Sequence, residues 1–580
     1  MYINTTTGYN TPKINSLKSN NQKNPSFGSA AGFVSESLRY LSVNESIGAT
    51  LVDFFSMALP RTIVDSTRGL DAGIETGIRE NSGTVNHVMI GTIGGAAAYA
   101  LAPQFNKNYA VRSHAIFANN ETIDILGRIW HEDFQKFKDV EDKSLQQKAF
   151  YKSAFERMEG LNSSDGKTAN WVKLKPQTIE ALTETLTDLS QDRDLRAKRI
   201  PKEKLEYLKT LIISDTGAEK SFKLVAKDNS KTVEFAVASF LDDLFALGRA
   251  FTKTNVAKAF EESANNFDAN KFIKELKGLK MRSTFLALGI SSAIGASVQP
   301  FNRWLTKKRT GNDGFVGVAN NPDAQNSKKA DSSAGFITAK CIAAASILSL
   351  CLGSISTNIK EIPNKLQFKG KIPILSHFKL VYGFTIASRF LAARSSDELR
   401  EACFKDFLGF ANWLILGGFV SKGIATMLNG KELLNSTSDV DKKGFLNWLK
   451  NKSVKTVDEI LLSDLTQKGI QTVKDGKALS YKELLLKAKS LGMSDTLTKI
   501  KHLNIAQAAG YIYSGVVLGY LIPKLNIKMT AYNNRKKEKV EAQTQVNNKI
   551  ELAQEKDENK PVSNSTKAVF ATFMKQLNIN

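Results

Sequence analysis

Five stretches of this chain carry almost no charge over roughly the width of a bilayer, and strongly hydrophilic sequence separates them. An α-helix rises about 1.5 Å per residue, so about 20 apolar residues cross the hydrocarbon core of a membrane. The five stretches are 84–104, 283–302, 341–359, 407–428 and 502–523. The pattern predicts an all-α fold, a multi-span helical membrane bundle. The alternative is a set of helices buried on all sides in a large water-soluble core.

A sixth apolar stretch, 372–393, differs from the others because it contains Lys379 and Arg389. Charged side chains are costly inside lipid. Three interpretations fit this stretch: a further span, a re-entrant segment, or a helix that lies at the membrane interface.

Two hydrophilic inserts separate the apolar stretches. In the first, residues 105–282, apolar side chains step by three and four positions, as at Ile123, Leu126 and Trp130. That spacing is typical of amphipathic helices, and no stretch alternates convincingly with period two. We therefore predict a soluble α-helical domain here and a smaller helical insert at 429–501.

The two ends of the chain are polar. Residues 1–30 are rich in Asn, Ser, Thr and Lys, and 524–580 begins with a polybasic run, so both are expected to be largely disordered. Between 31 and 83 the sequence predicts amphipathic, Gly-rich helices. There Gly69, Gly73 and Gly77 recur every fourth residue, which suits either a helix face or a glycine-rich loop.

All five apolar stretches contain small residues four positions apart. Such spacing lets helix backbones approach closely in lipid, although chance matches are frequent in Gly-rich and Ala-rich sequence. The pairs are Gly91 and Gly95, Ser291 and Gly295, Ser349 and Gly353, Gly417 and Ser421, and Gly515 and Gly519. They favour a packed bundle over isolated anchors.

Three of the stretches end in a similar way, with proline followed within three residues by asparagine. The pairs are Pro103 and Asn106, Pro300 and Asn302, and Pro523 and Asn526. Proline ends or kinks a helix, and asparagine favours a cap or turn. Two readings remain open: a repeat of one ancestral unit, as in many transporters, or a common way for membrane helices to end.

The net charge indicates which classes of partner the chain could bind. The formal charge of +23 attracts anionic surfaces. Two basic clusters, Lys307, Lys308 and Arg309, and Arg535, Lys536 and Lys537, follow apolar stretches and are suited to anionic lipid headgroups. Nucleic acid is disfavoured, because the charge is dispersed and consists mostly of Lys without interleaved aromatic residues.

The chain shows no motif for catalysis, cofactors or metals. His131 and Glu132 begin like a zinc-protease helix, but Gln135 stands where the second histidine belongs. The three cysteines cannot form a disulfide framework, and the N-terminus lacks the pattern of a cleaved signal peptide. We expect a protein that is not an enzyme and that binds no cofactor.

These observations favour a multi-pass protein of an inner or plasma membrane, with a structural or interaction role, that displays its inserts to protein partners. Two alternatives are a transporter or channel, and a secreted protein that inserts helices into another membrane. Against transport, the predicted spans hold ionisable residues only near their ends: His87, Lys422 and His502.

Overall fold

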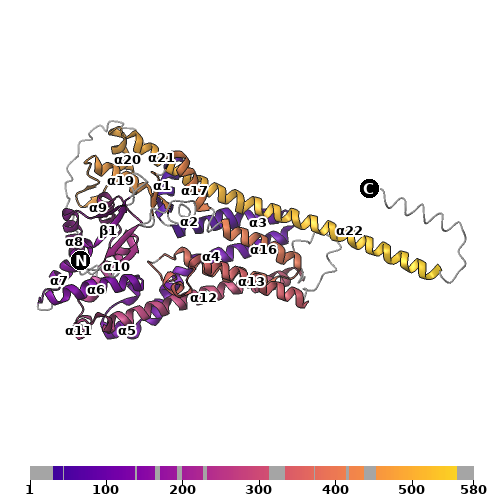
Figure 1. Cartoon of the computed structure of the whole chain (residues 1–580), viewed down its shortest axis with the longest axis horizontal. Coiled ribbons are helices and arrows are strands. Elements are labelled where there is room, and N and C mark those ends of the chain that lie inside the picture. Colours follow the sequence, from indigo (N-terminus) through magenta and orange to yellow (C-terminus); the bar gives the residue numbers. More distant parts are fainter. Residues whose placement is uncertain are drawn as a thin grey trace, which may run out of the picture.

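The structure is a computed structural model that describes residues 30–43, 45–137, 140–162, 170–192, 199–225, 232–311, 333–370, 372–412, 417–430, 432–436 and 452–557. It is mostly helical and has two regions (Figure 1). Long helices form a bundle. The two inserts gather at one end of it and form what we call the head. The N-terminal residues 1–29, for which we predicted disorder, lie outside the described residues.

The bundle contains the long helices and several short ones. Its elements are α1 (Ala30–Val43), α2 (Glu45–Leu51), η1 (Val52–Ala58), α3 (Leu59–Ser66), α4 (Leu70–Leu101), α5 (Pro103–Tyr109), α12 (Lys271–Thr310), α13 (Ala334–Ile355), η6 (Ile359–Glu361), α14 (Ile362–Lys365), α15 (Leu375–Ala392), α16 (Ser396–Ala411), α17 (Gly417–Asn429), α21 (Ser494–Ser514), η8 (Gly515–Leu521) and α22 (Ile522–Asp557). Helix α12 packs against α4 and α15, α13 packs against α15, and α17 packs against α21.

Among the described residues, four helices are long and apolar enough to cross a membrane, or five if the bent pair α4 and α5 is one span. They are Ser46–Ser66, Lys271–Thr310, Ala334–Ile355 and Ser494–Asn533. Lys271–Thr310 and Ser494–Asn533 contain the predicted stretches 283–302 and 502–523. Ala334–Ile355 covers the predicted stretch 341–359 only up to residue 355. Stretch 84–104 lies in the bent pair, whose first helix begins already at Leu70.

The candidate span Ser46–Ser66 was missing from the sequence prediction. Asp53 and Arg61 interrupt its apolar run, yet both side chains are buried against other helices, so they do not face lipid. The predicted stretch 407–428 is not tested, because its residues 413–416, between α16 and α17, lie outside the described part.

The three span-end prolines have different effects. Pro103 stands where the axis bends by 58° between α4 and α5. Pro300 lies inside α12, which continues to Thr310, and Pro523 is the second residue of α22. The expectation that each proline closes its helix therefore holds only at Pro103.

The first insert is not purely helical. Its elements are η2 (Ser113–Ala115), α6 (Asn120–Phe137), α7 (Lys143–Glu156), β1 (Met158–Asn162), β2 (Asn170–Lys173), α8 (Pro176–Gln191), α9 (Lys202–Thr216), β3 (Phe222–Val225), β4 (Thr232–Phe235), α10 (Val237–Phe251), α11 (Thr254–Glu262) and η3 (Phe267–Ala269). The strands form an antiparallel sheet in the order β2-β1-β3-β4, with Met158 opposite Leu224. Each strand has only four or five residues, too few for a clear period of two.

The second insert is small and also contains short strands: β5 (Leu434–Ser436), β6 (Lys452–Val454), α19 (Val457–Gln467), β7 (Val473–Lys474), β8 (Lys477–Ala478) and α20 (Tyr481–Ser490). Helices α19 and α20 both begin with a capping box, Thr456 with Glu459 and Ser480 with Glu483. Glu459 also accepts a hydrogen bond from the backbone of Glu219 at 2.8 Å. The two inserts therefore form one head.

The C-terminal segment differs from the expected disordered tail. Helix α22 continues as a single helix to Asp557 and extends past the rest of the bundle (Figure 1). Its exposed part is rich in Lys, Glu, Gln and Ala, which have high helix propensity, so a polar composition here does not prevent a helix. Residues 558–580 lie outside the described part.

Candidate functional site

Twelve charged side chains form one cluster inside the bundle, between helices α3, α4, α15 and α16. We call it the ionic cluster. Its basic members are Arg61, Arg68, Arg79, Arg389, Arg394 and Lys405, and its acidic members are Asp65, Glu75, Glu80, Glu398, Glu401 and Asp406. Positive and negative charges are equal in number. Burial of so many charges is tolerable only when each has an opposite partner.

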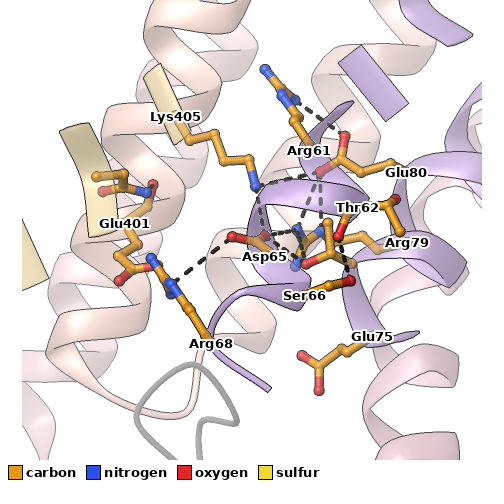
Figure 2. Close-up of polar contacts among 12 residues, drawn as sticks. Arg61, Thr62, Asp65, Ser66, Arg68, Glu75, Arg79, Glu80, Glu401 and Lys405 are labelled. Carbon is orange, nitrogen blue, oxygen red and sulfur yellow. Dashed lines mark hydrogen bonds and ion pairs between the residues drawn. The ribbon is translucent and has the colours of Figure 1, made fainter. Parts of the chain in front are cut away.

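Glu80 pairs with several cations of the cluster (Figure 2). Its carboxylate lies 3.1 Å from the guanidinium of Arg61, 3.2 Å from that of Arg79 and 3.9 Å from the ammonium of Lys405. Lys405 reaches in turn to Asp65 at 3.3 Å. Helix α16 is thereby joined to both α3 and α4 through one buried ammonium group.

Two further ion pairs are reciprocal. Arg68, which follows α3, binds Glu401 of α16 at 2.9 Å, and Arg394, which follows α15, binds Glu75 of α4 at 2.7 Å. Each arginine thus reaches the helix that follows the other arginine in sequence. The side chain of Arg394 is only 2% exposed, so its pair with Glu75 is fully inside the protein.

The reciprocity reflects two similar segments of sequence. Residues 68–95 and 394–421 align without a gap, and we call them the first and second repeats. The matched positions are Arg68 and Arg394, Asp71 and Asp397, Glu75 and Glu401, Arg79 and Lys405, Glu80 and Asp406, Gly83 and Gly409, Asn86 and Asn412, Gly91 and Gly417, and Gly95 and Ser421. Most of the cluster therefore consists of equivalent residues from two copies of one unit.

A second pair of segments follows the same pattern after each insert. Ser291, Gly295, Asn302 and Thr306 of α12 align without a gap with Gly515, Gly519, Asn526 and Thr530 of η8 and α22. The two asparagines have equivalent contacts. Asn302 donates to the backbone oxygen of Glu75 at 3.1 Å, and Asn526 donates to that of Glu401 at 3.1 Å.

Two of the three asparagines that follow span-end prolines, Asn302 and Asn526, therefore bind the equivalent glutamates of the two repeats. Thr530 also donates to the carboxylate of Glu401. Asn106 differs, because it accepts from the backbone and hydroxyl of Ser113 at the edge of the head. It does not belong to the repeated unit.

Two small cavities adjoin the cluster. One, of about 30 Å³, is lined by residues of both repeats, including Glu75 and Glu401. The other, of about 40 Å³, is lined by Asp53 and His87 among others. Arg79 and Arg389 line both cavities and so lie between them. Each cavity is large enough for a water molecule but not for an organic solute.

Asp53 and His87 form a polar pair deeper in the bundle. The imidazole Nδ1 of His87 lies 3.1 Å from the carboxylate of Asp53, which also accepts from the hydroxyl of Thr84 at 2.9 Å. All three side chains are buried.

The predicted packing residues fall into two groups. A Cβ atom on Gly295 would lie 2.4 Å from the hydroxyl of Thr385, and one on Gly519 would lie 2.6 Å from the backbone oxygen of Ser56, so these two glycines permit close helix approach. Ser291 is buried and accepts from Asn86 through its backbone oxygen.

The other small residues have looser surroundings. A Cβ on Gly95 or Gly353 would meet nothing within 4 Å, and on Gly515 it would only touch Ser56 at 3.4 Å. Gly91 lines a further small cavity with Gly95, Ser349 lies in α13, and Gly417 and Ser421 lie in α17.

The two basic clusters lie at the ends of α12 and along α22, away from the head. Arg309 pairs with Asp71 at 3.1 Å, and Lys308 lies over the ring of Trp304. Lys307 is in the last turn of α12. Arg535 and Lys536 are exposed on α22, which also contains Lys537.

Sequence reasoning missed the ionic cluster because its residues lie just outside the predicted spans. Arg61 to Glu80 precede stretch 84–104, and Asp406 precedes 407–428. From the sequence alone, Arg389 was considered only as a charged residue that makes 372–393 a less suitable membrane span. The signal that could have found the cluster is the repeat itself, Arg-x6-Glu-x3-basic-acidic-x2-Gly-x2-Asn.

No protein-family model, curated protein or solved structure matches this chain.

Proposed function

We propose that this protein is a membrane transport protein, and that its transport path runs between the two repeats and carries protons or a solute coupled to protons. The observation that carries the proposal is the buried ionic cluster, formed mostly by equivalent residues of both repeats. Charged residues inside a membrane bundle are rare and mark ion or substrate paths. In transporters built from repeats, the site lies where the repeats meet.

The outer surface of the bundle supports a location in lipid. Its exposed side chains are large and apolar, including Val88 and Met89 on α4 and Ile290 and Ile294 on α12. Ile63 and Phe301 continue this surface to the level of the cluster. Lipid outside and charge inside is the arrangement expected of a transport path.

The size of the cavities limits the substrate. With about 30 and 40 Å³, they hold water but no organic solute in this conformation. Carboxylates line both cavities, and the imidazole of His87 lines the second one. We therefore assign the proton as the moving species or the coupling ion.

Proton flux in proteoliposomes tests this function. Vesicles containing a pH-sensitive dye and a valinomycin-imposed potential should acidify faster with the protein than without it. Asp53→Asn should lower the flux at least tenfold, because an amide cannot carry the proton, while it still accepts from Thr84. Glu203→Gln, an exposed carboxylate of the head, is the matched control and should leave the flux unchanged.

Flux no faster than in empty vesicles, from protein that is monodisperse and folded, would refute the proposal. That outcome would favour the second candidate, a membrane-anchored interaction protein. The observation behind this candidate is the head, in which Thr456 donates to Glu219 at 2.7 Å and joins the two inserts into one displayed surface.

A further inference from the structure

A large cleft lies in the head, far from the ionic cluster. Its volume is about 500 Å³, against about 30 and 40 Å³ for the two cavities beside the cluster. It is formed by the start of α7, the ends of α8 and α10, and residues 110–116, which follow α5. Pockets for small molecules span about 300 to 1,000 Å³, so this cleft has the volume for a whole metabolite or headgroup.

Positive charge dominates the cleft. Among the described residues that line it, the basic side chains are Arg112, Lys143, Arg199, Arg249 and Lys253, and the carboxylate is that of Asp242. They come from four separate parts of the chain, so their convergence is a property of the fold and not of one basic run.

Arg199 is held in place with one donor left over. Its guanidinium lies 3.8 Å from the ring centroid of Phe117, and its Nη1 donates to Asp242 at 3.2 Å. Its Nη2 is buried and has no hydrogen-bond partner among the described residues, so this atom does not face the cleft. The stacked guanidinium nevertheless places a fixed positive charge at the wall of the cleft, and this charge attracts an anion.

Neutral side chains form an ordered floor. Gln147 donates to the hydroxyl of Thr252 at 3.2 Å and accepts from Gln191 at 3.0 Å. Phe245 and Ile116 supply apolar surface beside them. The cleft thus combines an apolar and amide floor with a cationic rim, the composition of a site for an organic anion.

The backbone at the edge of the cleft is strained. Ala110 has φ 53° and ψ 33°, the left-handed region, where a Cβ costs about 1 kcal/mol. This residue ends α5 and turns the chain into the wall of the cleft. Strained backbone of this kind concentrates at binding sites.

We propose that the cleft binds a phosphorylated organic ligand through its arginine and lysine side chains. The ligand is either a soluble phosphorylated metabolite or the phosphorylated headgroup of a lipid, because α5 continues directly from the candidate span α4. This inference is independent of the proposed transport function.

Thermal unfolding of the purified full-length chain in detergent tests the proposal. The probes are ATP, inositol 1,4,5-trisphosphate and a short-chain phosphatidylinositol 4,5-bisphosphate, with sulfate at equal ionic strength as reference. At least one probe should raise Tm saturably, as expected for a ligand that binds only the folded state. The double variant Lys143→Gln, Lys253→Gln should weaken that binding at least tenfold, because both lysines are at the exposed rim and their loss leaves the fold intact.

Lys152→Gln is the matched control, since Lys152 is exposed on α7 but does not line the cleft. A lipid that binds at least tenfold more tightly than its own headgroup identifies a lipid ligand, and equal or weaker lipid binding identifies a soluble one. Tm shifts no larger than those of sulfate, or binding that survives the double variant, would overturn the proposal.

Discussion

The bundle and the first insert differ in the side chains that they bury and expose. In the insert, aromatic side chains form the interior, where the rings of Trp130, Phe150 and Phe260 each lie within 5.5 Å of that of Phe251. Leu145 is the one large apolar side chain that is exposed among its described residues. In the bundle twelve charged side chains lie beside an apolar core, and many large apolar side chains are exposed, such as Val88, Ile290 and Phe301. If the bundle lies in a membrane, as we propose, the difference corresponds to two solvents, water around the head and lipid around the bundle.

The largest effect is expected where the interior is apolar. Phe251→Ala should lower the free energy of unfolding of the insert by about 3 to 5 kcal/mol, because it removes a fully buried ring and its aromatic contacts. Thermal unfolding followed by limited proteolysis measures it. The bundle should stay protected, and simultaneous cleavage of both regions would show that they unfold as one unit.

A similar or slightly smaller loss is expected in the charged interior. Arg394→Gln leaves Glu75 and Glu398 without their cation and should cost about 3 to 5 kcal/mol. Arg68→Gln, the equivalent position of the first repeat, should cost a comparable amount. Breaking the exposed pair Lys477 and Glu203 should cost less than about 1 kcal/mol.

Denaturant titration in detergent compares the two arginine variants with Lys477→Gln. Equal stability of all three would contradict the view that the charged interior holds the bundle together.

Asp243 is expected to make the stability of the head depend on pH. Burial, with a smaller contribution from Asp242, raises the pKa of Asp243 to about 8, although Lys280 and Arg199 oppose the rise. The folded state therefore binds a proton that the unfolded state releases above about pH 4. The contribution of Asp243 to the free energy of unfolding is therefore largest below about pH 4. It decreases as the pH rises to about 8, by at most about 1.4 kcal/mol per pH unit.

Asp243→Asn should flatten the dependence of Tm on pH between 4 and 8. Melting curves of the variant and the parent at several pH values measure the effect, and an unchanged slope would exclude Asp243 as its source.

The smallest change in stability should come from two equally exposed apolar positions. Val88 in the bundle is 57% exposed and Leu145 in the insert is 54% exposed. In a background with the three cysteines replaced by serine, Val88→Cys and Leu145→Cys should each alter stability by less than about 0.5 kcal/mol. A membrane-impermeant maleimide should label position 145 in proteoliposomes with outward-facing heads and leave position 88 unlabelled. Equal labelling would remove the distinction between the two solvents.

Much of the helical framework could be predicted from the sequence, because uncharged runs such as 341–359 have few alternatives. Charged residues prevented the prediction of other parts of the fold. The candidate span Ser46–Ser66 was missed because it contains Asp53 and Arg61, and a sequence does not show that both are buried against partners. The strands around Met158 and Leu224 are too short for their alternation to stand out. The ionic cluster depends on contacts between residues more than 300 positions apart, such as Arg68 and Glu401, and only the alignment of the two repeats reveals it.

The reciprocal pairs have the geometry of a self-complementary dimer contact. In an isologous interface, residue i of one subunit binds residue j of the other, and j binds i. Arg68 with Glu401 and Arg394 with Glu75 fulfil this rule within a single chain. A polypeptide with only one of the repeats could make such contacts only with a second copy of itself, at a cost that depends on concentration. Covalent linkage makes them intramolecular, and it frees each half to change separately, as Arg79 and Lys405 already have.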